Sequence, residues 1–419
     1  MARYLLSAMP FTGHIAPICA IADALVVRGH DVRIYTGAAF RSRVEATGAR
    51  LVAWAAAPDF DENDLATTFP RLVGKKGLGQ LLINVQDVFI RTAPAQVSDL
   101  RAEWDREPWD AMAGDEVSVG MALHAEESGR PWATIAILPL NLASSQGPPS
   151  GMGITPGRNP LTRARDAALR AAVPLLARSL SKPLAEASAA IGLPPARRTF
   201  ERVVFSPRLV IASGADILDY DRTDRPASVH FVGQLRAPAP PVALPDWWGD
   251  LDGRTVIHVT QGTQNIDPDD LIRPALEALA DRDVLVVVAT GVAGRDELPF
   301  AVPENARVGG FLPYAELLPR VELIVTNGGW GGTLAALAHD IPLVIGGGDL
   351  DKPEIAARVA WTGAGVNLRT GTPSAAKVGA GVDRVLRGVS FREAAARVGA
   401  RLRALGGAAR AAELLETLL

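Results

Sequence analysis

Residues 325–333 (Val-Thr-Asn-Gly-Gly-Trp-Gly-Gly-Thr) form the segment of this chain whose residue types point most directly to chemistry. The segment follows a mostly apolar run at 321–325, which predicts a buried strand, and it leads into a helix-forming run at 334–338. Glycines at a strand-to-helix turn allow the backbone to approach a ligand closely, and the following helix directs free N–H groups and its positive dipole end toward that ligand. The segment therefore predicts a phosphate or diphosphate site. The alternative is a glycine-rich connection that binds nothing.

Strand-like and helix-like runs alternate along both halves of the chain, which predicts parallel sheets covered by helices. In the first half, strands are expected near residues 3–8, 31–36, 51–54, 109–114, 131–137 and 209–213, the last of which would close that half. Helices are expected between them near 17–28 and 117–128. In the second half, strands are expected near 256–260, 284–289, 322–326 and 341–345, with helices near 268–280, 331–338 and 353–361.

The length of 419 residues exceeds one ordinary hydrophobic core, so we expect two domains. A segment with four prolines, 236–245, indicates a linker or a stiff surface loop. We expect Rossmann-like α/β domains at residues 1–218 and 219–419, which face each other across a cleft at the carboxyl ends of their strands. Residues 390–419 are rich in Ala, Arg and Leu at helical spacing, and we expect this segment to cross back onto the first domain.

The composition is that of a soluble globular protein, with 48% hydrophobic and 21% charged residues. A net charge of −3 gives no electrostatic basis for binding nucleic acid or an anionic membrane. Cys19 is the single cysteine and can form neither an internal disulfide nor a zinc cluster, which fits a reducing cytoplasm. The sequence shows no signal-peptide pattern and no apolar run of bilayer length, so we expect a cytoplasmic monomer or homodimer without stable membrane insertion.

Two common ligand classes of such folds are disfavoured by the motifs. A nicotinamide dinucleotide site needs G-x-G-x-x-G after the first strand and an acidic residue at the end of the second strand. Here the first turn contains Gly13 alone, and the second strand ends in Tyr35, Thr36 and Gly37. The P-loop pattern with Gly-Lys-Ser or Gly-Lys-Thr is also missing from the sequence. A redox enzyme and an NTPase are therefore disfavoured.

Short motifs in both halves resemble those of a known enzyme family. In the first half they are Thr-Gly-His-Ile-Ala-Pro at 12–17 and Arg-Gly-His-Asp-Val at 28–32. In the second half they occupy residues 258–263, 308–319, 325–347 and 351–368. In this order and spacing they resemble the GT-B nucleotide-sugar glycosyltransferases, the UDP-glycosyltransferase-like family that includes antibiotic, macrolide and plant natural-product enzymes.

The resemblance implies an inverting glycosyltransferase with two facing Rossmann-like domains. Such an enzyme moves a hexose from a UDP- or dTDP-sugar to a hydroxyl of a small-molecule, natural-product acceptor, and the resemblance implies no required cofactor besides this co-substrate. Two alternatives stay open: a nucleotide-sugar epimerase of the same fold, and a non-catalytic helper protein that binds a sugar nucleotide. A functional pair of His14 and Asp115 would argue against both.

A hydroxyl acceptor requires a general base, and imidazole, with a pKa of about 6.5, suits this task. By resemblance, His14 occupies the position of the base; the alternatives are a helix-start residue or a packed turn residue. Asp115 stands where the family has the carboxylate that orients the base. Asp115 could instead cap the helix that follows, and the neighbouring Glu116 leaves the choice of carboxylate open.

The resemblance also implies a set of donor contacts on facing turns, where fixed N–H groups stabilise the charge on the leaving diphosphate. The nucleobase is expected near Phe311, Leu312 and Tyr314. The implied donor-binding residues are Gly13, Gln261, Gly262, Thr263, Phe311, Leu312, Asn327, Gly328, Gly329, Trp330, Gly331, Gly332, Thr333, Asp351 and Lys352.

Three of these positions have more than one interpretation. Asn327 stands where many relatives carry a histidine that binds diphosphate, and asparagine donates a hydrogen bond without carrying charge. Lys352 stands where the family commonly has a glutamine that binds the sugar. It could pair with Asp351, reach the diphosphate, select a different sugar or form a structural salt bridge. Trp330 could pack beneath the diphosphate.

The acceptor is expected in the first domain, where aromatic residues and the helix around 168–180 could form an apolar pocket. These aromatic residues are Trp54, Phe60, Phe69 and Phe89, each of which could equally belong to the core. Asp349 and Asp351 form an Asp-x-Asp pair outside the context in which that pattern binds metal, so we expect no required metal. The histidines at 124, 230, 258 and 339 are expected to have core or surface roles.

Overall fold

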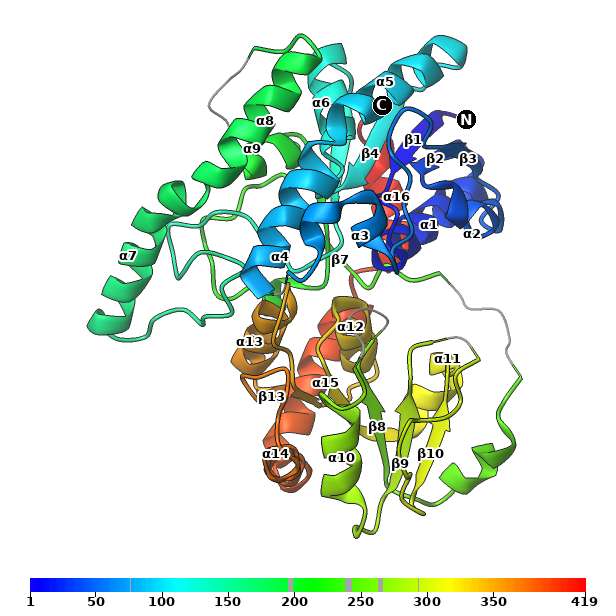
Figure 1. The fold of residues 1–419 in the computed structure, drawn as a ribbon, viewed down its shortest axis with the longest axis vertical. Helices are drawn as coiled ribbons and strands as arrows, with labels where there is room; N and C mark the ends of the chain where they lie inside the picture. Colours follow the sequence, from blue (N-terminus) through cyan, green and yellow to red (C-terminus); the bar gives the residue numbers. More distant parts are fainter. Residues whose placement is uncertain (76, 195–198, 238–242, 263–266, 293) are drawn as a thin grey trace.

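Two parallel β-sheets, each covered by helices, form the two halves of the chain, as seen in a computed structural model (Figure 1). The structure describes residues 1–75, 77–194, 199–237, 243–262, 267–292 and 294–419. Figure 1 shows the first half above and the second half below, with the last helix, α16, returning to the upper half. The predicted α/β fold with two facing domains is confirmed.

The first sheet has seven strands in the order β3-β2-β1-β4-β5-β6-β7, with all neighbouring strands parallel. The strands are β1 (Arg3–Ser7), β2 (Asp31–Thr36), β3 (Arg50–Ala53), β4 (Ala111–Asp115), β5 (Trp132–Ala136), β6 (Val210–Ser213) and β7 (Val229–Gly233). The helices are α1 (Thr12–Val27), α2 (Arg41–Glu45), α3 (Leu65–Thr68), α4 (Gly77–Ile83), α5 (Ala93–Arg106), α6 (Val119–Ser128), α7 (Pro160–Leu176), α8 (Arg178–Ala190) and α9 (Phe200–Val204). Central strands such as β4 are buried along their whole length, because helices cover both faces of a parallel sheet.

The second sheet has six parallel strands in the order β10-β9-β8-β11-β12-β13. The strands are β8 (Val256–Thr260), β9 (Leu285–Ala289), β10 (Ala306–Gly309), β11 (Val321–Thr326), β12 (Leu343–Ile345) and β13 (Gly365–Asn367). The helices are α10 (Ile272–Leu279), α11 (Tyr314–Leu317), α12 (Trp330–Ala338), α13 (Lys352–Thr362), α14 (Ala375–Arg387), α15 (Val389–Arg403) and α16 (Gly407–Glu416).

The strands that the sequence predicts all form, but β7, β10 and β13 were not expected. β10 and β13 are short, and polar residues such as His230 in β7 and Arg307 in β10 interrupt the apolar pattern. The expectation that the strand at 209–213 closes the first half was wrong, because β7 pairs with β6 in parallel. The first sheet therefore continues past residue 218. In the chain, β7 and β8 flank the proline-rich segment 236–245, of which residues 238–242 lie outside the described residues.

Helix α1 begins at Thr12, earlier than the start near residue 17 that the sequence predicts, and Pro17 lies inside it. Proline lacks the N–H that would bond to the carbonyl four residues earlier, so it is tolerated near the start of a helix at the loss of one hydrogen bond. This earlier start places His14 within the first helical turn rather than in a loop before it.

Residues 168–180 fall on α7 and α8. Most of the described side chains of α7 are exposed, and Figure 1 shows this helix projecting from the body of the first domain. Within the described ranges of the chain, no helix has both the length and the apolar character needed to cross a membrane.

The predicted return of the C-terminal segment is confirmed by α16, which packs on the first domain although it follows the second. Ala411, Ala412 and Leu415 are fully buried in an apolar cluster with Ile15 and Ile18 of α1. The carboxylate of Glu416 accepts hydrogen bonds from Arg28 (2.8 and 2.6 Å) and lies 2.8 Å from His30 Nε2. These bonds lower the pKa of Glu416 to about 2.

We expect Leu415→Ala to lower the free energy of unfolding by about 2–5 kcal/mol, because it leaves a cavity between α16 and α1. Urea denaturation measures this change, and Leu419→Ala serves as the control because Leu419 is exposed. A loss no larger than that of the control would show that α16 does not stabilise the first domain.

Candidate active site

His14 and Asp115 meet at the carboxyl edge of the first sheet. His14 lies in the first turn of α1, which follows β1, and Asp115 is the last residue of β4. Because β1 and β4 are adjacent and parallel, with Ser7 opposite Gly114, their ends reach the same edge. His14 Nδ1 lies 2.9 Å from Asp115 Oδ2, and the imidazole remains 15% exposed while the carboxylate is fully buried.

Further hydrogen bonds hold the Asp115 carboxylate in this orientation. Oδ2 also accepts the Met9 N–H at 2.9 Å, and Oδ1 accepts Val117 N–H and the Ser118 hydroxyl at 3.1 and 2.9 Å. Burial alone would raise the pKa of Asp115, but the charge of His14 and these hydrogen bonds hold it below its usual value. The N-cap of α6 is Ser118, so Asp115 does not cap that helix.

Opposing effects act on the pKa of the His14 imidazole. Burial lowers its pKa, while the charge and hydrogen bond of Asp115 raise it, and the net result is a raised pKa. Because Nδ1 faces Asp115, Nε2 is the nitrogen available to accept a proton. The pair therefore has the geometry of an oriented general base.

The Glu116 carboxylate binds backbone N–H groups and does not contact His14. Its carboxylate accepts the N–H groups of Ile137 and Leu138 at 2.8 Å each, which ties the end of β4 to the segment after β5. Burial, followed by the charge of Asp115, raises its pKa to about 7. The carboxylate that hydrogen-bonds His14 is that of Asp115, not that of Glu116.

The four predicted acceptor-side aromatic residues belong to one apolar cluster beside His14. Phe89 has its ring centroid 6.5 Å from that of His14, and Phe60 lies 5.4 Å from Phe69 and 5.9 Å from Trp54. Phe89 is half-buried on a π-helical segment, Asn84–Ile90, a distortion that often occurs at functional sites. Within the segment 168–180, Leu180 of α8 packs on a neighbouring apolar cluster that also contacts Phe89, so the contribution of this segment to an acceptor pocket stays a prediction.

The glycine-rich turn follows β11, as the sequence predicts, and α12 begins at Trp330 with Gly329 as its N-cap. The N-cap residue, Gly329, has no side chain that could cap this helix, so we expect the N–H groups of the first turn to be available for an anion. A Cβ added to Gly331 or Gly332 would meet no atom within 4 Å, which shows open space in front of the turn. At Gly328, with φ of +90°, a Cβ would lie 2.7 Å from Ile345 Cγ2, so this position requires glycine.

Asn327 braces the turn from within. Its Nδ2 donates to the Gln261 carbonyl, its Oδ1 accepts the Gly329 N–H at 3.2 Å, and its own N–H donates to Thr260 O at 3.3 Å. These bonds join the turn after β11 to the turn after β8. The family resemblance implies that the Asn327 side chain contacts the diphosphate. In the structure, this side chain instead holds the backbone of the turn.

In the turn after β8, the Gln261 side chain does not point toward the expected donor site. The Gln261 side chain points inward, where Nε2 donates to Asp267 O at 2.8 Å and Oε1 accepts the Ile272 N–H at 3.2 Å. Gly262 adopts φ of +74°, and Thr263 lies outside the described residues. The side chain of Gln261 therefore anchors the start of α10, and only its backbone lines the turn.

Trp330 does not place its ring beneath the glycine turn, which corrects that expectation. Its indole Nε1 donates to Ser213 Oγ at 2.8 Å, at the end of β6 in the other domain. The ring is buried against Gly214, where an added Cβ would lie 2.7 Å from Trp330 Cζ2. The side chain therefore packs between the domains, while its backbone begins α12.

Asp351 and Lys352 begin α13, opposite His14. Asp351 is the N-cap residue, and its negative charge is among the influences that raise the pKa of His14. Burial raises the pKa of Asp351 itself. Lys352 Nζ pairs with Asp349 Oδ1 at 3.1 Å, which favours the structural salt bridge among the interpretations of Lys352.

Of the residues expected near a nucleobase, only Phe311 presents its side chain, which is 61% exposed. Leu312 is buried in the core of the second domain against Gly309, so its side chain is not available to a ligand. The Tyr314 hydroxyl lies 3.0 Å from Nε2 of His258, a core residue whose pKa burial lowers to about 4. No group of three metal-ligating side chains occurs among the residues that the structure describes.

Comparison with known proteins decides the family. Residues 273–416 match a family model described as erythromycin biosynthesis protein CIII-like, C-terminal domain. The chain is 39% identical over 422 aligned residues to 4'-demethylrebeccamycin synthase of Lentzea aerocolonigenes, with 100% of both chains covered. It is 32% identical over 410 residues to UDP-glucosyltransferase B1 of Starmerella bombicola, covering 93% of this chain and 92% of the relative.

The chain belongs to the UDP-glycosyltransferase-like family. This glycosyltransferase also resembles the solved structure of the glycosyltransferase of kitacinnamycin, with a TM-score of 0.76 and 21% identity over 100% of this chain and 99% of that one. The structural similarity shows the GT-B fold. The family predicted from the sequence is thus confirmed, while the individual roles of the site residues stay predictions.

Two residues of the glycosyltransferase that the sequence did not indicate, Phe11 and Glu62, contact the first turn of α1. The ring of Phe11 is 5.4 Å from that of His14 and 5.2 Å from that of Phe60. Glu62 accepts the N–H of Thr12 at 2.8 Å and also its hydroxyl, which caps the helix from a distant loop. Phe11 directly precedes the motif at 12–17 and could have been noticed, whereas nothing in the weakly patterned segment around Glu62 indicates its role.

We expect Asp115→Asn to lower the pKa of His14, because the variant removes the negative charge that stabilises the imidazolium. NMR titration of the labelled imidazole measures this pKa directly. Asp110→Asn is the control, since Asp110 pairs with Arg3 away from His14. An unchanged pKa of His14 in Asp115→Asn would contradict the electrostatic coupling.

We expect Asn327→Ala to weaken the binding of UDP or dTDP by about tenfold, because the glycine turn loses two internal hydrogen bonds. Isothermal titration calorimetry measures the Kd. Asn305→Ala is the matched control, because its amide also braces loops of this domain through the carbonyls of Leu279, Arg282 and Val284. Equal Kd values for both variants would assign Asn327 to stability alone.

Proposed function

We propose that the glycosyltransferase transfers a hexose, with inversion, from a UDP- or dTDP-sugar to a hydroxyl of an apolar natural-product acceptor, with His14 as the general base. The observation that carries this proposal is the bond between His14 Nδ1 and the buried carboxylate of Asp115 at 2.9 Å, which leaves Nε2 to accept a proton. The relatives named as a demethylrebeccamycin synthase and a UDP-glucosyltransferase support the acceptor class and the donor class.

The proposed reaction is a single displacement. The acceptor oxygen attacks the anomeric carbon from the face opposite the diphosphate, and its proton moves to Nε2 of His14. The bond between the anomeric carbon and the diphosphate oxygen breaks, so the configuration inverts. The buried Asp115 stabilises the imidazolium that forms.

The donor side must stabilise the negative charge that develops on the diphosphate. The uncapped first turn of α12 and the open space before Gly331 and Gly332 support binding of the diphosphate there. Gly13, where an added Cβ would also meet no atom within 4 Å, leaves comparable space on the acceptor side. Because the helix dipole and the N–H groups supply the positive potential, we propose that transfer needs no metal ion.

The acceptor side supports an apolar substrate. Phe11 and Phe89 lie directly beside His14, and Phe60 extends the aromatic cluster beyond Phe11. An aromatic or polycyclic aglycone would gain burial on these rings while its hydroxyl reaches Nε2. Asp351 approaches the same imidazole from the second domain, at the position proposed for sugar hydroxyls.

We expect His14→Ala to reduce kcat/KM for transfer by about 10²–10⁴-fold while the Kd for UDP or dTDP changes less than about twofold. Product mass after incubation with a panel of hydroxylated aglycones gives the rate. His339→Gln, an exposed histidine of the second domain, is the control. Unchanged turnover in His14→Ala would exclude the base role, and absence of any product with the unaltered protein would argue for the helper-protein alternative.

The pH dependence follows from the raised pKa of His14. A base acts in its neutral form, so kcat/KM should be low in acid and rise as pH passes through a midpoint above about 6.5. In Asp115→Asn this midpoint should move to lower pH, with a lower plateau because the imidazole loses its orienting partner. A wild-type midpoint below that of free imidazole would contradict the proposed coupling.

A further inference from the structure

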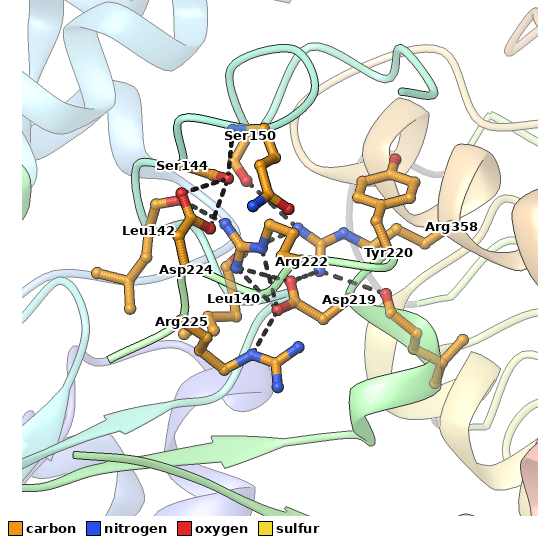
Figure 2. A network of polar contacts seen from close by, with 12 residues as sticks. Leu140, Leu142, Ser144, Ser150, Asp219, Tyr220, Arg222, Asp224, Arg225 and Arg358 are labelled. Carbon is orange, nitrogen blue, oxygen red and sulfur yellow. Dashed lines mark hydrogen bonds and ion pairs between the residues drawn. The ribbon is translucent and has the colours of Figure 1, made fainter. Parts of the chain in front are cut away.

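A buried ionic network joins the two domains on the side of α13 (Figure 2). Its centre is Arg358, a residue of α13 that is only 2% exposed. Arg358 Nη1 donates to Asp219 Oδ1 at 2.9 Å, and Nε donates to Glu354 Oε1 at 2.9 Å. Nη2 donates to the Leu140 carbonyl at 2.8 Å. One guanidinium thus contacts three separate parts of the chain.

Asp219 connects this arginine to the segment between β6 and β7 of the first domain. Its carboxylate also accepts from Arg222 at 2.8 Å and from Arg225 at 3.0 Å, so three guanidinium groups converge on one fully buried carboxylate. Figure 2 shows these side chains meeting at Asp219. Arg222 Nη1 also donates a hydrogen bond to the Leu142 carbonyl at 2.8 Å.

The same network holds the loop at residues 138–159, which follows β5 in the acceptor domain. Beyond the contacts of Leu140 and Leu142, the Ser144 hydroxyl donates to Asp224 at 2.9 Å. Glu354 Oε2 accepts the Gly153 N–H at 2.9 Å. At Gly153 a Cβ would lie 2.8 Å from Pro353 Cβ, so the loop backbone rests directly on the first turn of α13.

The N-cap of this first turn is Asp351, whose negative charge is among the influences that raise the pKa of His14. Burying charges costs solvation, and an apolar contact of the same size would stabilise the interface equally well. What directional ion pairs add is a single spacing between the elements that they join. Reacting groups must approach within about 3–3.5 Å, and a displacement of about 1 Å can cost about 10²-fold in rate.

We propose that Arg358 is a positioning residue that sets the spacing between the donor helix α13 and the acceptor domain that carries His14. The inference rests on the proposed transfer reaction. Arg358 touches neither substrate in this scheme; it acts through Asp219, Glu354 and the 138–159 loop. Losing it should leave nucleotide binding, a property of the second domain, largely intact while transfer slows.

The test compares Arg358→Met and Arg358→Lys with Arg33→Met. Arg33 is the matched control, because it is equally buried and paired with Glu103, but entirely within the first domain. For each variant we would measure the melting temperature, the Kd for UDP and dTDP, and kcat. Double electron–electron resonance measures the interdomain distance between nitroxide labels at Arg41→Cys and Arg387→Cys, one in each domain. The native Cys19 is buried, so we expect it to remain unlabelled.

We expect Arg358→Met to lower kcat by about 10- to 100-fold, to change Kd by less than about twofold, and to broaden the distance distribution. Arg358→Lys keeps the positive charge but loses the planar set of guanidinium donors, so its kcat should lie between those of Arg358→Met and wild type. If Arg358→Met does not fold, Arg358→Lys provides the test. Arg33→Met should lower the melting temperature without changing kcat or the distance.

An unchanged distance distribution and kcat in the Arg358 variants would overturn the positioning role. Parallel losses of kcat in Arg33→Met and Arg358→Met would also overturn it, since they would reflect stability alone. If the wild-type protein forms no product, the proposed transfer fails. The distance distribution then still decides whether Arg358 holds the domains at one spacing.

Discussion

Both halves of the site depend on one constraint of parallel sheets: strand order reverses at a single point, and the loops on its two sides diverge to leave a crevice. In the first sheet this point lies between β1 and β4, whose carboxyl ends carry His14 and Asp115. In the second it lies between β8 and β11, whose turns carry Gly262 and Asn327. The candidate base and the candidate anion site thus occupy equivalent places in two sheets.

The two crevices differ in the sign of the charged or polar groups that surround them. On the first side, negative charge is concentrated around the imidazole, from the ionised Asp115 and from Asp351 across the interface, which stabilises a proton on His14. On the second side, the described part of the glycine turn has backbone N–H groups at an uncapped helix start. In the proposed reaction, the imidazole that gains a proton and the diphosphate that gains negative charge would each meet a complementary environment.

The relation between the domains is fixed by three kinds of contact. Helix α16 buries apolar side chains against α1, and the Trp330 indole donates to Ser213 across the interface. The third contact is ionic and centres on Arg358. Apolar packing supplies most of the stabilisation because it is roughly proportional to buried area, whereas the hydrogen-bonded contacts are directional and specify one arrangement.

The local patterns of the sequence were sufficient for the main strands, for the glycine turn and, through motifs in both halves, for the family. These features depend on residues close together in the chain, whose periodicity and turn chemistry persist in the fold. The strands β7, β10 and β13 escaped prediction because their sheet positions are set by neighbours rather than by their own residues.

The sequence by itself therefore determined the two α/β halves, the glycine-rich strand-to-helix turn and His14 as the candidate base. Only the tertiary structure decided which carboxylate orients His14, since Asp115 and Glu116 are adjacent in the chain but bond in different directions. It also decided that Asn327 and Gln261 brace backbone, that Trp330 spans the domains, and that Lys352 pairs with Asp349. The direction of a side chain depends on the partners that folding brings to it from distant parts of the chain, and residue type and spacing do not encode that direction.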